Sequence, residues 1–308
     1  MKIAVVGSGA IGGLFGSMLA QGGLDVTLVD TWQEHVACMN AHGLLIERPN
    51  GKTEAIPVKT TTHIQDAAEP DLIIIAVKSY DTEQAATDCL SIVRPDTMIL
   101  TVQNGVGNVD IIGNILGHHR ILAGTTSFGC TRLAPGKLKP SGVGEITIGE
   151  LSGNITPRLK QVVDTFSTAG FEMHTSQNVD SLIWSKLVVN VGINALTAIT
   201  MLTNGELLDH KETRSLQEAV VNEATRVAAA KKIDFLVADP LEWVRDVARN
   251  TYDNKSSMRQ DIERGSKTEI DFINGAIVKE GLALGIPTPV NDTLCKLVKT
   301  IEIRKHSS

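Results

Sequence analysis

Three polar side chains recur at every fourth residue in an otherwise apolar stretch of this chain. They are Lys186, Asn190 and Asn194, and their neighbours are leucine, valine and isoleucine. In a helix this spacing places the three on one stripe, which drifts by about 40° per step over about 12 Å. Apolar surroundings lower the pKa of a lysine toward neutrality, so such a lysine can protonate an oxygen that gains negative charge. A polar stripe that only hydrogen-bonds a neighbouring helix is the alternative.

A second feature with chemical meaning is the glycine-rich segment at residues 7–12, which reads GSGAIG. A short apolar run precedes it and an apolar helix pattern follows it, as in a dinucleotide-binding turn. The first glycine permits the turn, the second lets a pyrophosphate approach, and the third lets the helix pack closely. Helix N–H groups then face the phosphates. We predict that the cofactor-binding residues include this whole turn: Gly7, Ser8, Gly9, Ala10, Ile11 and Gly12.

The residue expected to select the cofactor is Asp30, which lies 18 residues after Gly12 at the end of the next strand. A carboxylate there accepts hydrogen bonds from the adenosine ribose and repels a 2′-phosphate. Residues 31–35 contain no lysine or arginine. The sequence therefore favours NAD over NADP. Two alternatives stay open: a more distant cation that accepts the phosphate, and an Asp30 that only caps the next helix.

The elements that must position these residues change in type along the chain. A helix is expected at 10–21, and strands at 2–6, 25–29, 44–47, 54–58, 72–77, 98–102 and 121–125, with a hairpin over 136–150. Such alternation predicts a parallel, doubly wound sheet. From about residue 179, helical periodicity fills 179–202, 206–231, 239–252 and 258–284. We predict a Rossmann-type dinucleotide-binding domain at 1–176 and an all-helical substrate domain at 177–308, with the active site between them.

Composition excludes several classes of protein. The 308-residue chain carries a net charge of −6 and shows no basic stripe, which argues against a nucleic-acid partner. Its four cysteines are scattered without metal-ligand spacing, so we expect no metal site and a reducing, cytoplasmic location. Residues 182–202 are apolar enough to suggest a membrane span, but the lysine and asparagines within them would be costly in lipid. A buried helix is expected instead.

Longer motifs carry a family resemblance along essentially the whole chain. They are AVKSYDT at 76–82, QNGVG at 103–107, GTTS at 124–127, WSKLVVNVGINALTA at 184–198, NGEL at 204–207, NKSSMRQDI at 254–262, TEIDFING at 268–275 and GIPTPVN at 285–291. Together with GSGAIG, these motifs resemble those of the ketopantoate reductase (2-dehydropantoate 2-reductase) family. The resemblance implies a Rossmann domain followed by a helical domain like that of 6-phosphogluconate dehydrogenase.

The resemblance also implies roles for residues on the substrate side. Lys186 corresponds to the proton donor to the ketone oxygen, and Glu269 to the acid beside that lysine and the nicotinamide ribose. The expected substrate contacts are Asn104, Asn190, Asn194, Asn204, Asn254 and Ser257, the last two toward the carboxylate end. Plainer explanations remain: Ser257 as a helix cap, Asn204 and Asn254 as turn residues, and Glu269 as a partner of a basic neighbour.

On the cofactor side, the resemblance implies contacts from Lys78, Asn104, Cys130 and Glu269. Lys78 follows a buried strand at the edge of the sheet where doubly wound folds bind ligands, although a solvated lysine is the alternative. Cys130 aligns with a position whose backbone touches the cofactor, in a locally unusual sequence. Most family members use NADPH and have a basic residue where this chain has Asp30, so the resemblance favours NADP and the local charge favours NAD.

The expected activity is reduction of ketopantoate to (R)-pantoate by NAD(P)H in pantothenate biosynthesis. A hydride would pass to the keto carbon and Lys186 would protonate the oxygen. Two alternatives stay open: a related NAD-dependent reductase of another small 2-keto acid, and a non-catalytic dinucleotide sensor. The sequence leaves the oligomeric state open, with a homodimer as one candidate.

Overall fold

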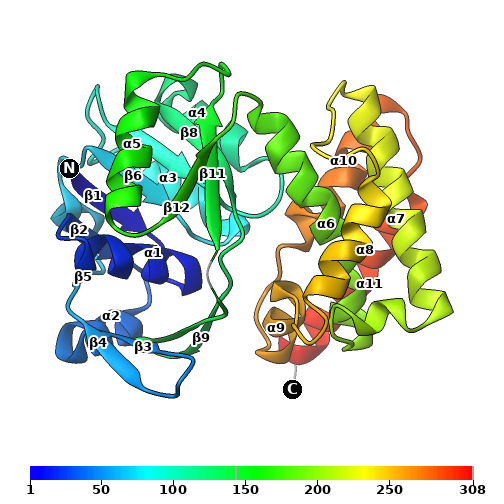
Figure 1. Cartoon of the computed structure of the whole chain (residues 1–308), viewed down its shortest axis with the longest axis horizontal. Helices are drawn as coiled ribbons and strands as arrows, with labels where there is room; N and C mark the ends of the chain where they lie inside the picture. The colour runs from blue at the N-terminus through cyan, green and yellow to red at the C-terminus, as the bar shows by residue number, and fades with distance from the viewer. Residues whose placement is uncertain (143, 307–308) are drawn as a thin grey trace. The chain divides into compact units, whose positions relative to one another are not determined.

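The structure is a computed structural model that describes residues 1–142 and 144–306. The chain folds into two compact units, which are described separately (Figure 1). The first unit comprises Met1–Gln103 and Asn108–Val179. The second comprises the chain from Asp180 onward together with Asn104–Gly107, a short segment that lies within the first unit by sequence.

The first unit is built on an eight-stranded sheet in the order β12-β11-β8-β7-β6-β1-β2-β5. The six strands from β8 to β5 are parallel, β11 is antiparallel to β8, and β12 runs parallel to β11. The strands are β1 (Lys2–Val6), β2 (Asp25–Val29), β5 (Lys59–Thr61), β6 (Leu72–Ile75), β7 (Met98–Thr101), β8 (Ile121–Thr126), β11 (Glu145–Glu150) and β12 (Glu172–Thr175). The predicted doubly wound sheet is therefore confirmed, and two strands of opposite direction, β11 and β12, are added at one edge.

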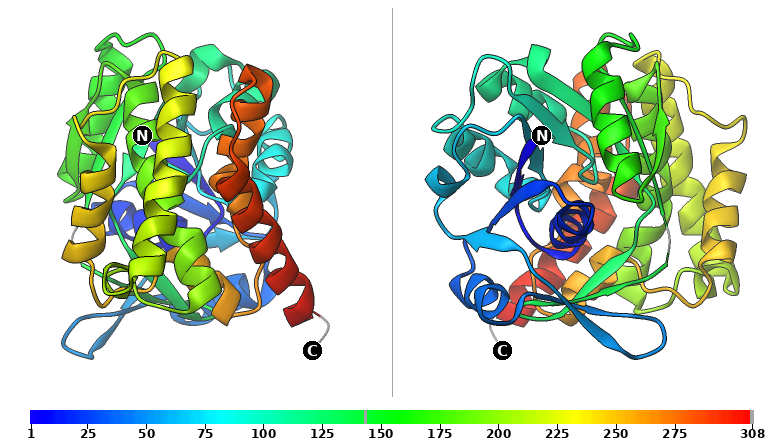
Figure 2. Two further views of the ribbon diagram at one scale, coloured as in Figure 1. Left: turned by 90° about the vertical axis from the view of Figure 1, so that its right-hand side faces the viewer. Right: turned by 60° about the vertical axis from the view of Figure 1, so that its left-hand side comes forward.

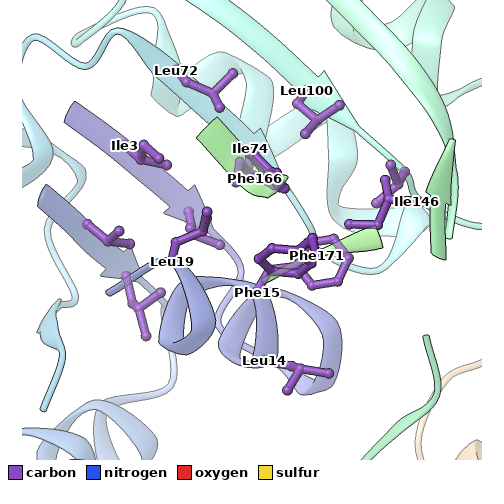
Figure 3. Close-up of a cluster of buried hydrophobic side chains, with 14 of the residues drawn as sticks. Ile3, Leu14, Phe15, Leu19, Leu72, Ile74, Leu100, Ile146, Phe166 and Phe171 are labelled. Carbon is purple, nitrogen blue, oxygen red and sulfur yellow. The ribbon is translucent and has the colours of Figure 1, made fainter. Parts of the chain in front are cut away.

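Helices of the first unit bury both faces of this sheet. Leu72 and Ile74 of β6 pack into the apolar cluster that also contains Phe15 and Phe166 (Figure 3). Ile73 and Ile75 point to the opposite face and are equally buried. The unit's helices are α1 (Ala10–Gln21), α2 (Gln33–His42), α3 (Thr82–Cys89), α4 (Asn108–Leu116) and α5 (Pro157–Thr168). Burial on both faces explains why β6 reads as an uninterrupted apolar run.

A second, four-stranded sheet corrects one prediction. Its order is β4-β3-β10-β9, from β3 (Leu44–Glu47), β4 (Thr53–Ile56), β9 (Cys130–Ala134) and β10 (Lys137–Pro140). The predicted hairpin over 136–150 is wrong, because β10 pairs with β9 and β3 while β11 joins the main sheet. Gly136, at φ +67°, supplies the tight turn before β10, so the hairpin partner precedes it. Position 143 lies outside the described residues. Figure 2 shows the β3–β4 hairpin, in blue, extending from this unit.

The second unit is helical, as predicted. Its helices are α6 (Val179–Thr200), α7 (Lys211–Ala230), α8 (Pro240–Asn250), α9 (Ser257–Glu263), α10 (Asn274–Leu284) and α11 (Pro289–His306). The expected helical stretch at 258–284 is interrupted, because Gly265 adopts φ +67° after α9 and a 3₁₀ turn, η5 (Ile270–Phe272), precedes α10. By length and composition alone α6 could cross a membrane, but 72% of its apolar window is buried within the protein. This burial agrees with the prediction of a buried helix at residues 182–202.

Candidate active site

The GSGAIG turn joins β1 to α1, and its three glycines meet three different surroundings. A Cβ on Gly7 would lie 2.7 Å from the backbone nitrogen of Val77, and Gly7 itself adopts φ +92°. A Cβ on Gly12 would lie 1.9 Å from the carbonyl oxygen of Gly7. A Cβ on Gly9, by contrast, would meet no atom within 4 Å. The first and third glycines are therefore needed for packing, and the second borders open space.

That open space fits the diphosphate of a dinucleotide. Gly9 is the residue that caps α1, and it offers no side chain to the N–H groups of the first turn. The first turn also contains no acidic residue that would repel an anion. Helix N-termini carry partial positive charge, so a bare helix start behind a glycine favours phosphate.

Asp30 follows β2 and is tied to the glycine-rich turn. Its Oδ2 accepts hydrogen bonds from the backbone nitrogen and from the hydroxyl of Ser8, both at 2.9 Å. Its Oδ1 accepts from the backbone nitrogen of Trp32 at 3.0 Å. The cap residue of α2 is Trp32, so Asp30 is not the cap of that helix. The sequence placed Asp30 at this edge but did not indicate its bond to Ser8.

Gln103 is a residue that sequence reasoning missed. Its side-chain amide donates to the carbonyl of Val77 at 2.7 Å and to the hydroxyl of Thr82 at 2.9 Å. Lys78 follows Val77 at the carboxyl end of β6, the edge of the sheet where the glycine-rich turn also lies. Gln103 therefore holds the backbone that carries Lys78. The only sequence signal was its place in the QNGVG motif.

Cys130 begins β9 in the smaller sheet. Burial raises the pKa of its thiol to about 12, so the sulfur stays protonated. It packs against the apolar cluster of the first unit. A protonated thiol is a poor nucleophile, so packing and backbone contacts are the roles that fit Cys130.

In the second unit, the predicted stripe lies on α6 and is largely buried. Lys186 and Asn190 are partly accessible, while Asn194 is 5% exposed. Desolvation lowers the pKa of Lys186 to about 8, and the negative charge of Glu269 opposes this shift. The side-chain nitrogen of Asn190 is buried and has no hydrogen-bond partner within the described chain. A buried unpaired donor is costly, so this amide fits a residue that binds a ligand.

Glu269 is buried at the start of η5, and the Asn104–Gly107 segment packs on the same turn. The backbone nitrogen of Val106 donates to the carbonyl of Phe272 at 2.9 Å. Gly105 adopts φ +85°, and a Cβ there would lie 2.4 Å from that carbonyl oxygen. Asn104 is thereby brought to the segment that carries Glu269. Only the tertiary structure reveals this placement.

The remaining predicted substrate residues meet at the loop before α9. The backbone nitrogen of Asn204 donates to the carbonyl of Asn254 at 2.9 Å, and the Asn204 amide donates to Thr251 at 3.0 Å. The side-chain oxygen of Asn204 is buried and has no partner within the described residues. Asn254 and Ser257 are exposed. Asn204 therefore has a turn role, and it also keeps a free acceptor.

The cap of α9 is Ser256 and not Ser257. The Ser256 hydroxyl accepts from the backbone nitrogen of Arg259 at 3.1 Å, and it lies 2.6 Å from the hydroxyl of Thr197. Thr197 is on α6, three residues beyond Asn194. The hydroxyl pair thus holds the loop with Asn254 and Ser257 against the end of the stripe. Sequence reasoning considered Ser257 as a cap and missed its neighbour.

Comparisons with known proteins match both parts of the chain to one family. Residues 3–153 match the family described as ketopantoate reductase PanE/ApbA, and residues 178–302 match its C-terminal family. A 2-dehydropantoate 2-reductase of Pyrococcus horikoshii is 38% identical over 98% of both chains. One of Halobacterium salinarum is 36% identical over 97% of this chain and 98% of its own.

Solved structures are similar over the whole chain. A PanE/ApbA family ketopantoate reductase from Ralstonia eutropha JMP134 has a TM-score of 0.92 and 33% identity, covering 99% of this chain and 100% of its own. A ternary structure of D-mandelate dehydrogenase with NADH and anilino(oxo)acetate has a TM-score of 0.94 and 33% identity, with the same coverage. Because both family matches and full-length relatives agree, the chain belongs to the ketopantoate reductase family.

Proposed function

We propose that this chain reduces 2-dehydropantoate to (R)-pantoate with a reduced nicotinamide dinucleotide. The observation that carries the proposal is a lysine with a pKa lowered to about 8, on one helical stripe with a buried, unpartnered amide. Full-length relatives that are named 2-dehydropantoate 2-reductase support the choice of substrate.

The dinucleotide would be held by the GSGAIG turn, Asp30, Lys78 and the backbone at Cys130. When bound, the reduced nicotinamide supplies the hydride. The open space at Gly9 and the uncapped start of α1 suit its diphosphate. Glu269 is the proposed contact to the nicotinamide ribose.

The substrate would be held by amides and hydroxyls of the second unit. Asn190 has an unpaired buried donor and Asn204 an unpaired buried acceptor, so each can form a hydrogen bond with a polar group of the substrate. The further proposed contacts are Asn104, Asn194, Asn254 and Ser257. A pocket of this kind selects a hydroxylated substrate, because an analogue without the hydroxyl would leave buried polar atoms unpaired.

Lys186 would stabilise the negative charge that develops on the keto oxygen and then transfer its proton to that oxygen. Glu269 raises the pKa of Lys186 against the effect of burial, which keeps the ammonium protonated at neutral pH. The decisive experiment measures oxidation of NADH and NADPH with 2-dehydropantoate. The proposal would be contradicted if neither NADH nor NADPH supported turnover. Binding of the cofactor without turnover of any 2-keto acid would favour a dinucleotide sensor.

We further propose NAD as the preferred cofactor, because the carboxylate of Asp30 ends β2 where a 2′-phosphate would have to lie. One observation favours NADP: the guanidinium of Arg132 lies 4.6 Å from the centroid of the Trp32 ring, two residues beyond Asp30. The test compares kcat/KM for the two cofactors in the unaltered enzyme and in Arg132→Ala. A strong preference for NADPH that Arg132→Ala abolishes would assign the phosphate to Arg132 and contradict the NAD proposal.

A second candidate substrate is another small 2-keto acid. The likeness to D-mandelate dehydrogenase is as extensive as that to the ketopantoate reductase of Ralstonia eutropha. Initial rates with 2-dehydropantoate, 2-ketoisovalerate, oxaloacetate and the 2-keto acid of mandelate would separate the candidates.

We propose the cytoplasm as the compartment, because all four cysteines are free thiols. We also propose a homodimer as the assembly, which light scattering would test.

A further inference from the structure

Ser8, the second residue of the glycine-rich turn, is held through all of its polar groups. It is completely buried. Its backbone N–H and its hydroxyl both donate to Asp30 at 2.9 Å. Its carbonyl oxygen lies 2.9 Å from Nε2 of His35. Asp30 and His35, which both follow β2 in the sequence, therefore fix Ser8 by hydrogen bonds at its N–H and at its carbonyl oxygen.

The hydrogen bonds of His35 determine which ring nitrogen carries the proton. The backbone N–H of Gly136 donates to Nδ1 at 2.8 Å, so Nδ1 is an acceptor. Nε2 must then carry the hydrogen and donate it to the carbonyl of Ser8. The imidazole is neutral and fully buried, and its ring stacks on Trp32 at a centroid distance of 5.4 Å and an angle of 10°.

The same imidazole thus connects three parts of the first unit that are distant in sequence. His35 lies on α2, Ser8 lies between β1 and α1, and Gly136 lies in the turn between β9 and β10. That turn packs tightly on α2, because a Cβ on Gly136 would lie 2.8 Å from the Cβ of Cys38. Rotation of the imidazole is therefore blocked by stacking and by both hydrogen bonds.

We propose that His35 is a positioning residue for the dinucleotide, which acts by fixing the carbonyl of Ser8 and, through it, the peptide plane that leads to Gly9. The proposal rests on the proposed use of a dinucleotide at this turn. The phosphate-binding N–H groups come directly after Ser8, so a rotated Ser8–Gly9 peptide would turn them away from the diphosphate. His35 does not touch the dinucleotide in this proposal.

The test compares His35→Leu, which removes both hydrogen bonds at similar volume, with His35→Gln, whose amide keeps a donor and an acceptor. His42, exposed at the end of α2, provides the matched control His42→Leu. Calorimetry measures the Kd of NADH and of ADP-ribose, a fragment that retains the diphosphate. Kinetics measure the KM of the keto acid and kcat at saturating NADH. Thermal unfolding reports the stability of each variant.

We expect His35→Leu to weaken both NADH and ADP-ribose by about tenfold or more, a change of about 1.4 kcal/mol. The KM of the keto acid and kcat at saturating NADH should not change, and His35→Gln should recover part of the affinity. Unchanged Kd values in His35→Leu would overturn the proposal. A rise in the KM of the keto acid as large as the rise in the Kd of NADH would also overturn it. If His35→Leu does not fold, His35→Asn takes its place, because its shorter amide cannot reach both partners. The same comparison then applies: weaker binding of NADH and ADP-ribose, with the KM of the keto acid and kcat unchanged.

Failure of this inference is distinguishable from failure of the proposed function. An unaltered protein that binds neither NADH nor ADP-ribose contradicts the proposed dinucleotide function itself. An unaltered protein that binds both, with His35→Leu binding them equally well, contradicts only the role of His35.

Discussion

At the scale of single residues, Lys186 and Glu269 determine how the chemistry depends on pH. Burial lowers the pKa of Lys186 to about 8, and Glu269 limits that fall. A lysine with this pKa is mostly protonated at neutral pH and gives up its proton more readily than an exposed lysine. The proposed proton transfer is therefore available near neutrality and is lost in alkaline solution.

We expect kcat to fall as pH rises through about 8, because the donor loses its proton there. Lys186→Ala should lower kcat by about 10² to 10⁴-fold while NADH still binds. Lys186→Arg keeps a positive charge that does not dissociate, so its residual activity should lack the alkaline fall. The measurement is a pH profile of kcat for the three proteins. Near-normal turnover in Lys186→Ala would remove Lys186 from the role of donor.

Replacing Glu269 by glutamine should move that profile. Without the opposing carboxylate, the pKa of Lys186 falls further, so the alkaline loss of kcat should begin at lower pH in Glu269→Gln. Glu280→Gln provides a control, because Glu280 pairs with Lys231 at 2.6 Å and is not among the groups that shift the pKa of Lys186. A profile that shifts in the control as well, or in neither variant, would contradict the proposed coupling.

At the scale of elements, two short loops carry proposed substrate-binding residues and are held in place by contacts with other elements. The Asn104–Gly107 segment follows the buried strand β7, yet its backbone bonds to η5 in the helical unit. The loop before α9 is held on α6 through the hydroxyls of Ser256 and Thr197. Both loops depend on close contacts, so both are sensitive to small changes in backbone geometry.

Gly105→Ala tests the first loop. Gly105 has φ +85° and a Cβ there would meet the Phe272 carbonyl at 2.4 Å, whereas Gly23 has φ +82° and open space. Gly23→Ala should cost about 1–2 kcal/mol from backbone strain alone. Gly105→Ala should cost more and should also raise the KM of the keto acid, because Asn104 moves with the loop. Thermal unfolding and KM measurements on both variants check this, and equal effects would contradict it.

At the scale of the whole molecule, each unit has its own apolar cluster, and the thiols are distributed over both. Burial raises the pKa of Cys89, Cys130 and Cys295 to about 12 in each case. Cys38 and Cys130 are partly accessible, whereas Cys89 and Cys295 are buried. Thiolate is the reactive form, so three of the four thiols should be protected while the protein is folded.

We expect Ellman's reagent at pH 8 to label Cys38 rapidly in the folded protein and all four cysteines in guanidinium. Cys38→Ser should abolish the rapid phase. Rapid labelling of Cys130 would contradict the raised pKa of its thiol and would reopen a reactive role for that residue.

Much of this molecule followed from local patterns. Short stretches of sequence were enough to predict three features: the turn from β1 into α1, the end of β2 before Asp30 and the buried strand β6. This is because strand and helix periodicity are short-range properties. The stripe of Lys186, Asn190 and Asn194 was equally visible, since four-residue spacing fixes a helix face. The family motifs added roles that no periodicity contains.

Only the tertiary structure decided which segments meet. It paired β10 with β9 and β3, placed the Asn104–Gly107 loop on η5, chose Ser256 over Ser257 as the cap of α9, and joined His35 and Asp30 to Ser8. The physical reason is that these contacts join residues far apart in the chain. Their partners are selected by the packing of the whole unit, and neighbouring residues carry no record of that choice.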